Sequence, residues 1–442
     1  MLFLFANNSD IYFTISSGRD ILNGHWYTNT HTNLPIIVQQ WLYAVICAEF
    51  DKLGLLGIYL LTFIQDVLLV YVTYIFIYNR TKNRWKSIVI PMIALIISFQ
   101  YMICVRPQII TMILLIIELI ILDKFTKTKN ILYLFWLIPL SILSANMHQA
   151  VFLYHIYIII PYLIIFTRPK NKIKINWKLL IFIPIMILCT LCTPYKLDGA
   201  LYTYHSFKSK VFDNVNISEI NPTSILSYFG IVIVLCVIYT MYLLYKGKSN
   251  KYINYYTITT MILLFISLRH FSIIYICLIF ILMTFSMQIN ISKLSFLCSM
   301  YIVIFLLVAS IIQIPKLDII KLRKEFNNLD IPKTATIYNM INAGGLLEYY
   351  GYNVLSDARP ELYTEEFCGK DIISNQSIFY TGYDTKNKKW MSNTEIENIY
   401  KDYDYVVVSS IAYVNKVLDS DSNYEKYKEI EDTYIIWKKA NN

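Results

Sequence analysis

The sequence predicts a mainly α-helical membrane protein, in which a polytopic bundle of about ten transmembrane helices precedes a small C-terminal α/β soluble domain. Of the 442 residues, 56% are hydrophobic and only 16% are charged, whereas soluble proteins have about 25% charged residues. Apolar stretches near the ~20 residues needed to cross a bilayer core recur between residues 54 and 314. Residues 1–314 contain 23 Lys and Arg against 10 Asp and Glu, and residues 315–442 contain 16 against 20.

The apolar stretches set the expected topology. Positive charges gather in alternate loops (79–87, 124–130, 168–178, 246–253 and Lys293), which together hold 16 Lys and Arg. The positive-inside rule assigns these loops to the cytoplasm, and this pattern excludes a nucleic-acid binder, whose basic residues would share one soluble surface. The expected spans are 54–78, 88–104, 107–123, 131–146, 150–167, 179–194, 225–245, 254–268, 271–288 and 294–314.

An even number of spans places both ends of the chain outside the cytoplasm. Residues 1–53 then form an external segment, in which Leu34 to Phe50 predicts an interfacial helix because its apolar run is interrupted by polar residues. The first six residues are too short to act as a signal or a span. We therefore expect either a further span upstream of this sequence or a span count that differs by one.

The remaining segments are a second external loop and the C-terminal domain. Residues 195–224 form the loop, and residues 315–442 are numerous enough to bury a core of their own. The alternation of apolar and turn residues predicts strands at Thr334–Tyr338, Tyr352–Leu355, Tyr405–Ser409 and Tyr434–Trp437, with a turn at Asn342–Gly345.

Polar residues in the apolar part gather at the external ends of the spans. Asp10 could deprotonate a hydroxyl, or it could cap the helix that follows. Arg106, at a helix start before Pro107, could bind phosphate oxygens, or it could anchor the helix at the interface. His148 lies at an external tip, where a solvated turn is the alternative. Arg269-His270 forms a tight basic turn that is costly unless it faces a cavity or an anion.

Two acids lie within the predicted spans. Intramembrane acids are functional candidates by default, and Asp66 is the main argument for a transporter. Neither Asp66 nor Glu118 lies at an external end, so we favour hydrogen bonding between helices for both.

A series of short motifs resembles one family. Asp10-Ile-Tyr-Phe-Thr-Ile-Ser-Ser-Gly18 resembles the D-L-W-W-H-L-x-T-G stretch of bacterial GT-C-like membrane glycosyltransferases, which use polyprenyl-phosphate sugars. The other fragments follow in the family's order: Gln40-Trp41-Leu42 for E-W-L, Arg106-Pro107-Gln108 for R-P-Q, Asn146-Met147-His148 for N-L-H, Thr193-Pro194-Tyr195 for N-P-Y, Glu219 for an external acid, Ala343-Gly344-Gly345 for G-G, and Asp357-Ala358-Arg359 for D-G-R.

The resemblance implies an activity and a role for each residue. Asp10 would be the catalytic base. Four basic residues (Arg106, His148, Arg269 and His270) would bind the phosphate of the donor. Glu219 and Gln40 would position the acceptor or its loop, and Asp357 and Arg359 would form a motif of the soluble domain. The expected reaction moves a sugar from a polyprenyl-phosphate donor to a glycan, lipid or protein acceptor of the bacterial cell envelope, on the external face of the cytoplasmic membrane, as in polysaccharide biosynthesis.

The chain departs from the family pattern at several of these positions. Asn8 replaces the first acid of the motif, Tyr12-Phe13 its tryptophan pair, Thr14 its histidine, and Gln40 the glutamate before W-L. Because hard cations need several oxygen ligands, the loss of acids argues against a divalent metal, and no cofactor is expected. Two other functions stay open: a transporter or flippase of lipid-linked glycans, and a non-catalytic scaffold for envelope assembly.

Overall fold

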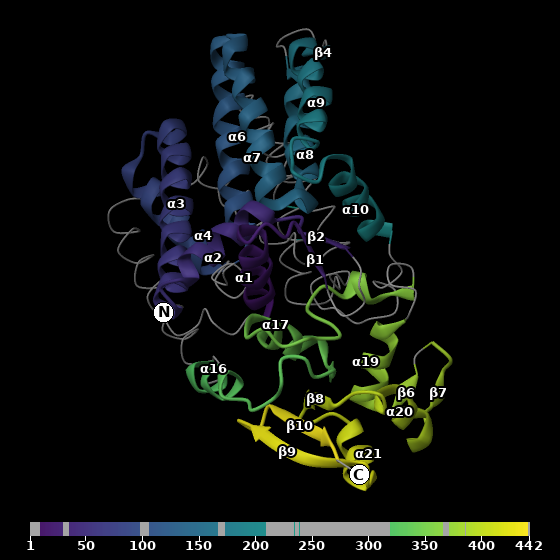
Figure 1. Cartoon of the computed structure of the whole chain (residues 1–442). Coiled ribbons are helices and arrows are strands. Elements are labelled where there is room, and N and C mark those ends of the chain that lie inside the picture. Colours follow the sequence, from purple (N-terminus) through teal and green to yellow (C-terminus); the bar gives the residue numbers. More distant parts are fainter. Residues whose placement is uncertain are drawn as a thin grey trace. The chain divides into compact units, whose positions relative to one another are not determined.

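The computed structural model describes residues 9–29, 35–97, 106–166, 173–208, 234, 238, 319–365, 371–384 and 386–440. The protein is mainly helical, with a mixed sheet in its C-terminal part (Figure 1). The chain divides into two compact units. The helical unit comprises residues 1–5, 58–203 and 217–314, and the mixed unit comprises residues 6–57, 204–216 and 315–442.

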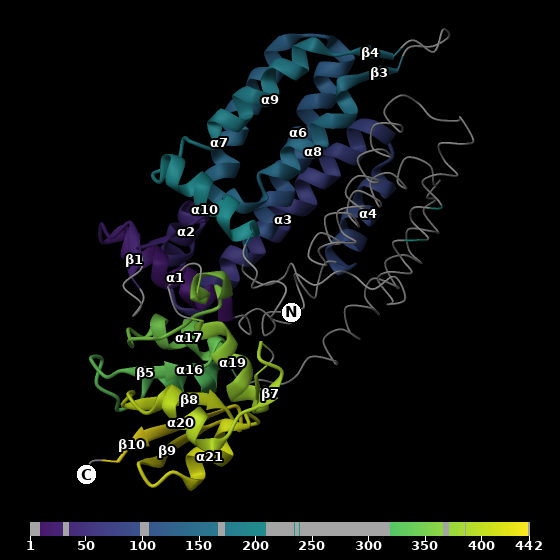
Figure 2. The same cartoon turned by 90° about the vertical axis from the view of Figure 1, so that its right-hand side faces the viewer.

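The helical unit is built around α6, which packs against η1, α7 and α8 while α9 packs against α7 and α8 (Figure 2). Its core is aliphatic and includes the fully buried Leu115, Ile116 and Leu119 of α6. The described elements are α3 (Leu55–Thr81), α4 (Arg84–Ile97), α6 (Gln108–Thr128), η1 (Ile131–Trp136), α7 (Leu137–His148), η2 (Gln149–Val151), α8 (Leu153–Leu163), β3 (Ile164–Phe166), β4 (Ile173–Ile175), α9 (Trp177–Cys189) and α10 (Lys196–Lys208).

Local signals explain where α6 begins and ends. Pro107 precedes its first residue, and the Thr111 hydroxyl donates to the Pro107 carbonyl oxygen at 3.2 Å. At the other end Lys129 takes a left-handed conformation, with φ of 61°, which closes the helix. The Asn130 side chain then accepts a hydrogen bond from the Leu132 amide and so starts η1.

Buried polar groups join the helices of this unit. Nδ1 of His155 lies 2.5 Å from Oε2 of Glu118, and its Nε2 lies 2.7 Å from the Ser144 hydroxyl. The contact links α6, α7 and α8. Unpaired polar groups are costly in such a core, so this chain of contacts favours one register of the three helices. It also gives Glu118 the helix-to-helix partner that its sequence position predicted.

The first six predicted apolar segments each contain a described helix, whereas the last four lie outside the described residues except for residues 234 and 238. The match is incomplete at 150–167, because α8 ends at Leu163 and the chain continues as strand β3. By length and apolarity, two described stretches, Leu55–Thr81 and Ile131–Val151, could cross a membrane; buried helices of soluble proteins meet the same criterion. The arrangement of ten spans therefore stays a prediction.

The mixed unit combines an N-terminal helix pair with the C-terminal sheet. Its sheet has the order β5-β8-β10-β9, with β5 parallel to β8 and the other neighbours antiparallel. The described elements are α1 (Ser9–Leu22), β1 (Tyr27–Asn29), β2 (Pro35–Ile37), α2 (Trp41–Asp51), α16 (Ile319–Asn327), β5 (Ile337–Asn339), α17 (Ile341–Tyr349), η4 (Pro360–Tyr363), α19 (Ile372–Thr381), β6 (Tyr383–Asp384), β7 (Lys389–Trp390), α20 (Asn393–Tyr400), β8 (Tyr405–Ser409), α21 (Val414–Ser420), β9 (Tyr424–Ile430) and β10 (Tyr434–Lys439).

Two of the expected strands are confirmed. Tyr405–Ser409 is β8, whose three consecutive valines are fully buried at the centre of the sheet. The strand expected at Tyr434–Trp437 is β10, which extends to Lys439. A continuous apolar run signals a strand that is buried on both faces, and β8 lies between two neighbours.

Other expectations for this unit were wrong in detail. The strand predicted at Thr334–Tyr338 is the shorter β5, and Tyr352–Leu355 makes only an isolated bridge between Val354 and Ile337. Residues predicted as a turn, Asn342–Gly345, lie in α17. There Gly344 allows close contact rather than a turn, because a Cβ atom would overlap the carbonyl oxygen of Ser356.

The segment predicted as an interfacial helix, Leu34–Phe50, also differs. Its first part pairs as β2 with β1, and the helix α2 begins only at Trp41. α2 packs against α1 (Figure 1), and its Tyr43, Ala44 and Cys47 are fully buried. The apolar residues of this segment therefore serve the core of the mixed unit.

Gly18 sets the distance between α1 and α2. A Cβ atom at this position would overlap the carbonyl oxygen of Ala44. Because that oxygen belongs to helix backbone, the helices would have to separate. We expect Gly18→Ala to lower the free energy of unfolding by about 1–3 kcal/mol or more, measured by thermal unfolding of the full chain in mild detergent. Ser16→Ala, at a partly exposed position of the same helix, is the control, and equal unfolding temperatures for both variants would contradict this packing.

Candidate functional site

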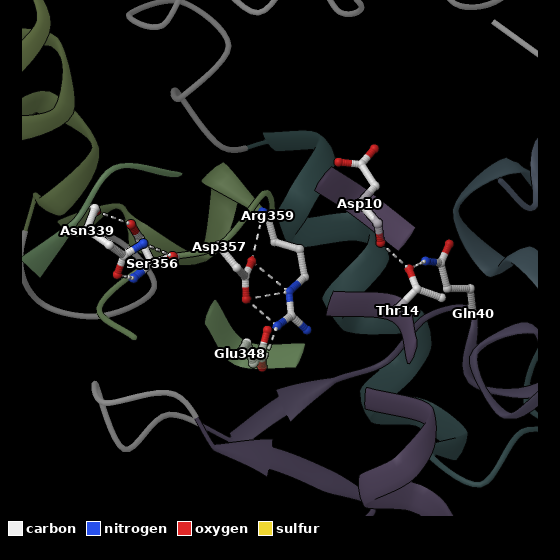
Figure 3. A network of polar contacts seen from close by, with 8 residues as sticks. All are labelled: Asp10, Thr14, Gln40, Asn339, Glu348, Ser356, Asp357 and Arg359. Carbon is white, nitrogen blue, oxygen red and sulfur yellow. Dashed lines mark hydrogen bonds and ion pairs between the residues drawn. The ribbon is translucent and has the colours of Figure 1, made fainter. Parts of the chain in front are cut away.

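Asp10 lies in the first turn of α1 and is partly exposed. The main-chain oxygen of Asp10 accepts a 2.7 Å hydrogen bond from Thr14, and the hydroxyl of Thr14 accepts one from the Gln40 amide at 3.2 Å. Figure 3 shows the Asp10 carboxylate pointing away from Thr14 and Gln40. The contacts therefore hold the helix turn that carries the acid without engaging its carboxylate.

These contacts join two positions at which the chain departs from the family pattern. Thr14 stands where the resemblance expects histidine, and Gln40 stands where it expects glutamate. Their side chains make a neutral hydrogen bond, so the substitutions leave neither group unsatisfied.

The aromatic pair that follows Asp10 packs against the C-terminal part of the mixed unit. The rings of Tyr12 and Tyr349 lie 5.4 Å apart in an edge-to-face arrangement, and the Arg359 guanidinium lies 4.8 Å from the centroid of the Phe13 ring. Edge-to-face and cation–π contacts of this kind each contribute on the order of 1 kcal/mol. The Tyr12-Phe13 pair thus attaches the helix of Asp10 to the segments that contain the G-G and D-G-R-like motifs.

A half-buried ion pair secures the same attachment further along α1. Arg19 contacts Oδ2 of Asp51 at 2.5 Å and donates to the main-chain oxygen of Tyr349 at 3.0 Å. The Tyr349 hydroxyl donates to the same carboxylate at 3.1 Å. Helices α1, α2 and α17 therefore share one hydrogen-bonded group.

Asp357 and Arg359 form the most buried ion pair of this unit. Nε of Arg359 lies 3.0 and 3.1 Å from the two oxygens of Asp357, Nη2 contacts Oδ2 as well, and the Arg359 amide donates to Oδ1 at 2.9 Å (Figure 3). Asp357 is completely buried. A buried arginine and carboxylate with this forked geometry satisfy each other, so Asp357 is a structural anchor and is not positioned to act as a base.

Glu348 lies beside this pair but is not neutralised by it. Its Oε1 is 4.0 Å from Nη2 of Arg359, and its Oε2 is buried without a hydrogen-bond partner among the described residues. Burial, together with the nearby Asp357 carboxylate, raises the pKa of Glu348 to about 8. Burial likewise raises the pKa of Asp20, a residue of α1 that lies near Glu348. These surroundings favour the protonated form of Glu348.

The motif residues of the helical unit form a second cluster. Thr111, one turn after the Arg106-Pro107-Gln108 motif, places its hydroxyl 2.9 Å from Nδ1 of His148. The Asn146 amide donates to the Cys192 main-chain oxygen at 3.0 Å, next to the Thr193-Pro194-Tyr195 motif. Three motifs separated by about 40 residues each along the chain are thus held together by side-chain hydrogen bonds.

The predicted site residues are distributed as follows. Asp10, Gln40, Asp357 and Arg359 belong to the mixed unit, and Arg106 and His148 belong to the helical unit. Arg269, His270 and Glu219 lie outside the described residues.

Sequence reasoning missed three residues that organise these clusters. Thr111 was detectable, because it follows Pro107 by four residues on a helix that the sequence predicted. Asp20 and Glu348 carried no signal of their own, since each resembles an ordinary charged residue on a helix surface. Only the packing of α1 on α17 buries them.

Among the described residues, no three or more His, Cys, Asp or Glu side chains form a group that could hold a metal ion. Comparison with protein-family models and with curated proteins finds no match to this sequence.

The raised pKa of Glu348 predicts that stability depends on pH. An unfolded glutamate has a pKa near 4.5, so the folded protein binds more protons than the unfolded chain between pH 4.5 and about 8. The free energy of unfolding therefore falls as pH rises through this window. We expect Glu348→Gln to match the wild type at pH 4.5 and to exceed its stability at pH 8.5 by more than about 1 kcal/mol, in thermal unfolding of the full chain.

Asp20, Asp357 and Arg359, the charged groups beside Glu348, are unchanged in this variant, so its difference from the wild type isolates the glutamate. Glu425→Gln, at an exposed position of β9, removes the same formal charge and is the control. Parallel pH profiles for the wild type and Glu348→Gln would show that Glu348 is ionised in the folded protein.

Proposed function

We propose that this protein is a GT-C-like membrane glycosyltransferase. It transfers a sugar from a polyprenyl-phosphate donor to an acceptor of the bacterial cell envelope, on the external face of the cytoplasmic membrane. The observation that carries the proposal is the convergence of the family-like motifs. In each unit, fragments that are far apart in the sequence meet through specific side-chain contacts.

In the mixed unit, the four family-like fragments are linked by contacts. Thr14 accepts a hydrogen bond from Gln40, Gly18 packs against Ala44 of the helix that contains Trp41-Leu42, and the Arg359 guanidinium lies over the Phe13 ring. Gly344 of the G-G-like fragment packs against Ser356, the residue before Asp357. Chance matches scattered along an apolar sequence have no reason to touch one another, so their contacts support a shared ancestral site.

A membrane location is supported by the surfaces of the helices. Leu56, Phe63, Trp136, Ile181 and Leu188 are each more than 60% exposed on helices of apolar composition. Large exposed apolar patches mark contact with lipid or a partner. The basic residues at the C-terminal ends of α3 and α6 lie at the opposite end of α6 from Arg106, as the positive-inside topology requires.

The proposed reaction is a single displacement at the anomeric carbon. The acceptor hydroxyl transfers its proton to the Asp10 carboxylate while its oxygen bonds to the anomeric carbon. The bond from that carbon to the phosphate oxygen of the donor breaks, and the configuration inverts. Arg106, His148, Arg269 and His270 stabilise the charge on the departing polyprenyl phosphate.

Asp10 is assigned the base because the resemblance gives it that role and because it is partly exposed. Asp357 is buried and satisfied by Arg359, and Asp51 is paired with Arg19. Glu219 and Gln40 are assigned to positioning of the acceptor or its loop, the role that the resemblance gives them. Asp357 and Arg359 then have a structural role, because Arg359 supports the Phe13 ring in the turn of α1 that follows Asp10.

A transporter for lipid-linked glycans is the less favoured function. Glu118 is bonded to His155 and, within the same bundle, Asp123 accepts a hydrogen bond from Tyr162 at 3.0 Å and pairs with Arg80. Glu118 and Asp123 are thus engaged in joining helices, whereas Oδ1 of Asp66 is buried without a hydrogen-bond partner among the described residues, so the hydrogen bonding expected of Asp66 is not seen for that atom. A non-catalytic scaffold is the remaining alternative, and the test of Asp10 addresses it directly.

Removing the proposed base should abolish transfer without unfolding the protein. We expect Asp10→Asn to lower the rate of transfer from a polyprenyl-phosphate sugar by about 10²–10⁴-fold, measured with radiolabelled donor in membranes from a host lacking the enzyme. Glu49→Gln, at an exposed position of α2, is the control. Wild-type rates in Asp10→Asn would remove Asp10 from the mechanism, and the absence of transfer by the wild type would favour the scaffold.

Arg106 should act through its forked guanidinium. Lysine keeps the charge but cannot bind two phosphate oxygens side by side. We therefore expect Arg106→Lys to lower kcat/KM for the donor by about tenfold or more, in the same assay. Arg84→Lys, at an exposed position in α4, is the control. Equal effects of the two substitutions would contradict phosphate binding by Arg106.

A further inference from the structure

A basic cavity lies in the helical unit at the C-terminal ends of α3 and α6. Its volume is ≈ 230 Å³. Four of the side chains around it are cationic and one is anionic. The lining residues are Phe76, Asn79, Arg80, Lys82, Ile120, Asp123, Lys124 and Lys127.

The single carboxylate of the cavity is already neutralised. Oδ2 of Asp123 pairs with Nη2 of Arg80, and Oδ1 accepts a hydrogen bond from Tyr162 at 3.0 Å. Both groups of the ion pair are largely buried, with side-chain exposures of 15% and 8%. The pair therefore forms a fixed wall of the cavity and leaves the charge of the three lysines uncompensated.

Lys82, Lys124 and Lys127 are exposed, and none has a carboxylate within ion-pair distance among the described residues. Lys82 lies over the Tyr78 ring, 5.3 Å from its centroid, and Lys124 lies 5.8 Å from the centroid of the Tyr133 ring. Three lysines without a carboxylate partner line one cavity, and such a concentration of positive charge favours an anion.

The cavity also has an apolar side, formed by Phe76 and Ile120. A free inorganic ion gains nothing from such a surface, whereas the glycerol and upper acyl carbons of a phospholipid would bury apolar area against it. Basic cavities between helices on the cytoplasmic side of membrane proteins suit lipid head groups. We infer that this cavity binds the phosphate head group of an anionic membrane lipid.

This site is distinct from the donor site proposed above. Arg106 immediately precedes the start of α6, whereas Lys124 and Lys127 lie in its last turns. A helix of 21 residues is about 30 Å long at ~1.5 Å per residue. A lipid in the cavity would therefore anchor the cytoplasmic ends of α3 and α6 without contacting Arg106.

The test compares lipid binding by the full-length protein and two triple variants. The probe is phosphatidylglycerol with brominated acyl chains, titrated into protein in phosphatidylcholine nanodiscs while Trp fluorescence is followed. We expect Lys82→Gln/Lys124→Gln/Lys127→Gln to weaken the affinity on the order of a hundredfold. The corresponding triple Arg variant, which keeps the charges, should retain affinity within about threefold.

A second triple variant, Lys324→Gln/Lys401→Gln/Lys416→Gln, removes the same charge from exposed positions of the mixed unit and should bind as the wild type does. Inorganic phosphate is the competing probe, and millimolar phosphate should leave the lipid bound. Equal lipid affinity in the wild type and the first variant, or displacement by phosphate, would overturn the inference; the latter would identify a free-anion site. Glycosyltransferase activity plays no part in these readouts.

Discussion

The packing of α1 between α2 and α17 is the constraint on which the mixed unit depends. The backbone of α1 can approach α2 only because Gly18 lacks a side chain, and that approach brings Arg19 to Asp51 and to the main chain of Tyr349. The same helix presents Phe13 to Arg359. One helix of 14 residues thereby connects the N-terminal segment with a domain that begins some three hundred residues later in the chain.

That packing also divides the acids of the unit into different chemical classes. Asp357 is removed from water, but its carboxylate is paired with the guanidinium of Arg359 and is not positioned to act as a base. Glu348 is removed from water as well, but no cation pairs with it as closely, and its pKa is raised as a consequence. Asp10 lies at the partly exposed start of α1. Its proposed catalytic role rests on the resemblance and on this position, although all three acids carry the same functional group.

In the helical unit, polar contacts also decide how the helices are arranged, although its core is apolar. Apolar contacts are non-directional, whereas the hydrogen bonds of Glu118 with His155 and of Thr111 with His148 need their partners in one register. Polar groups at the start of α6 hold the motif residues together, and the opposite end of the helix leaves lysines around a cavity. In the two proposals made above, the two ends of this helix bind different anions.

The sequence alone determined the mainly helical composition, the positions of six apolar helices, the strands at β8 and β10, and the identity of Asp10, Arg106 and His148 as candidates, because these follow from local periodicity and from residue chemistry. The predictions from sequence were wrong at Asn342–Gly345 and Leu34–Phe50. Glycines in the first segment indicated a turn and polar residues in the second indicated an interfacial helix, and the sequence does not show that neighbouring segments cover them. Tertiary structure decided that Gly344 serves close packing, that Asp357 is an anchor, and that Thr14 pairs with Gln40. Burial and pairing depend on which segments pack together, some of them far apart in the sequence as Arg19 and Tyr349 are, and no local pattern records that packing.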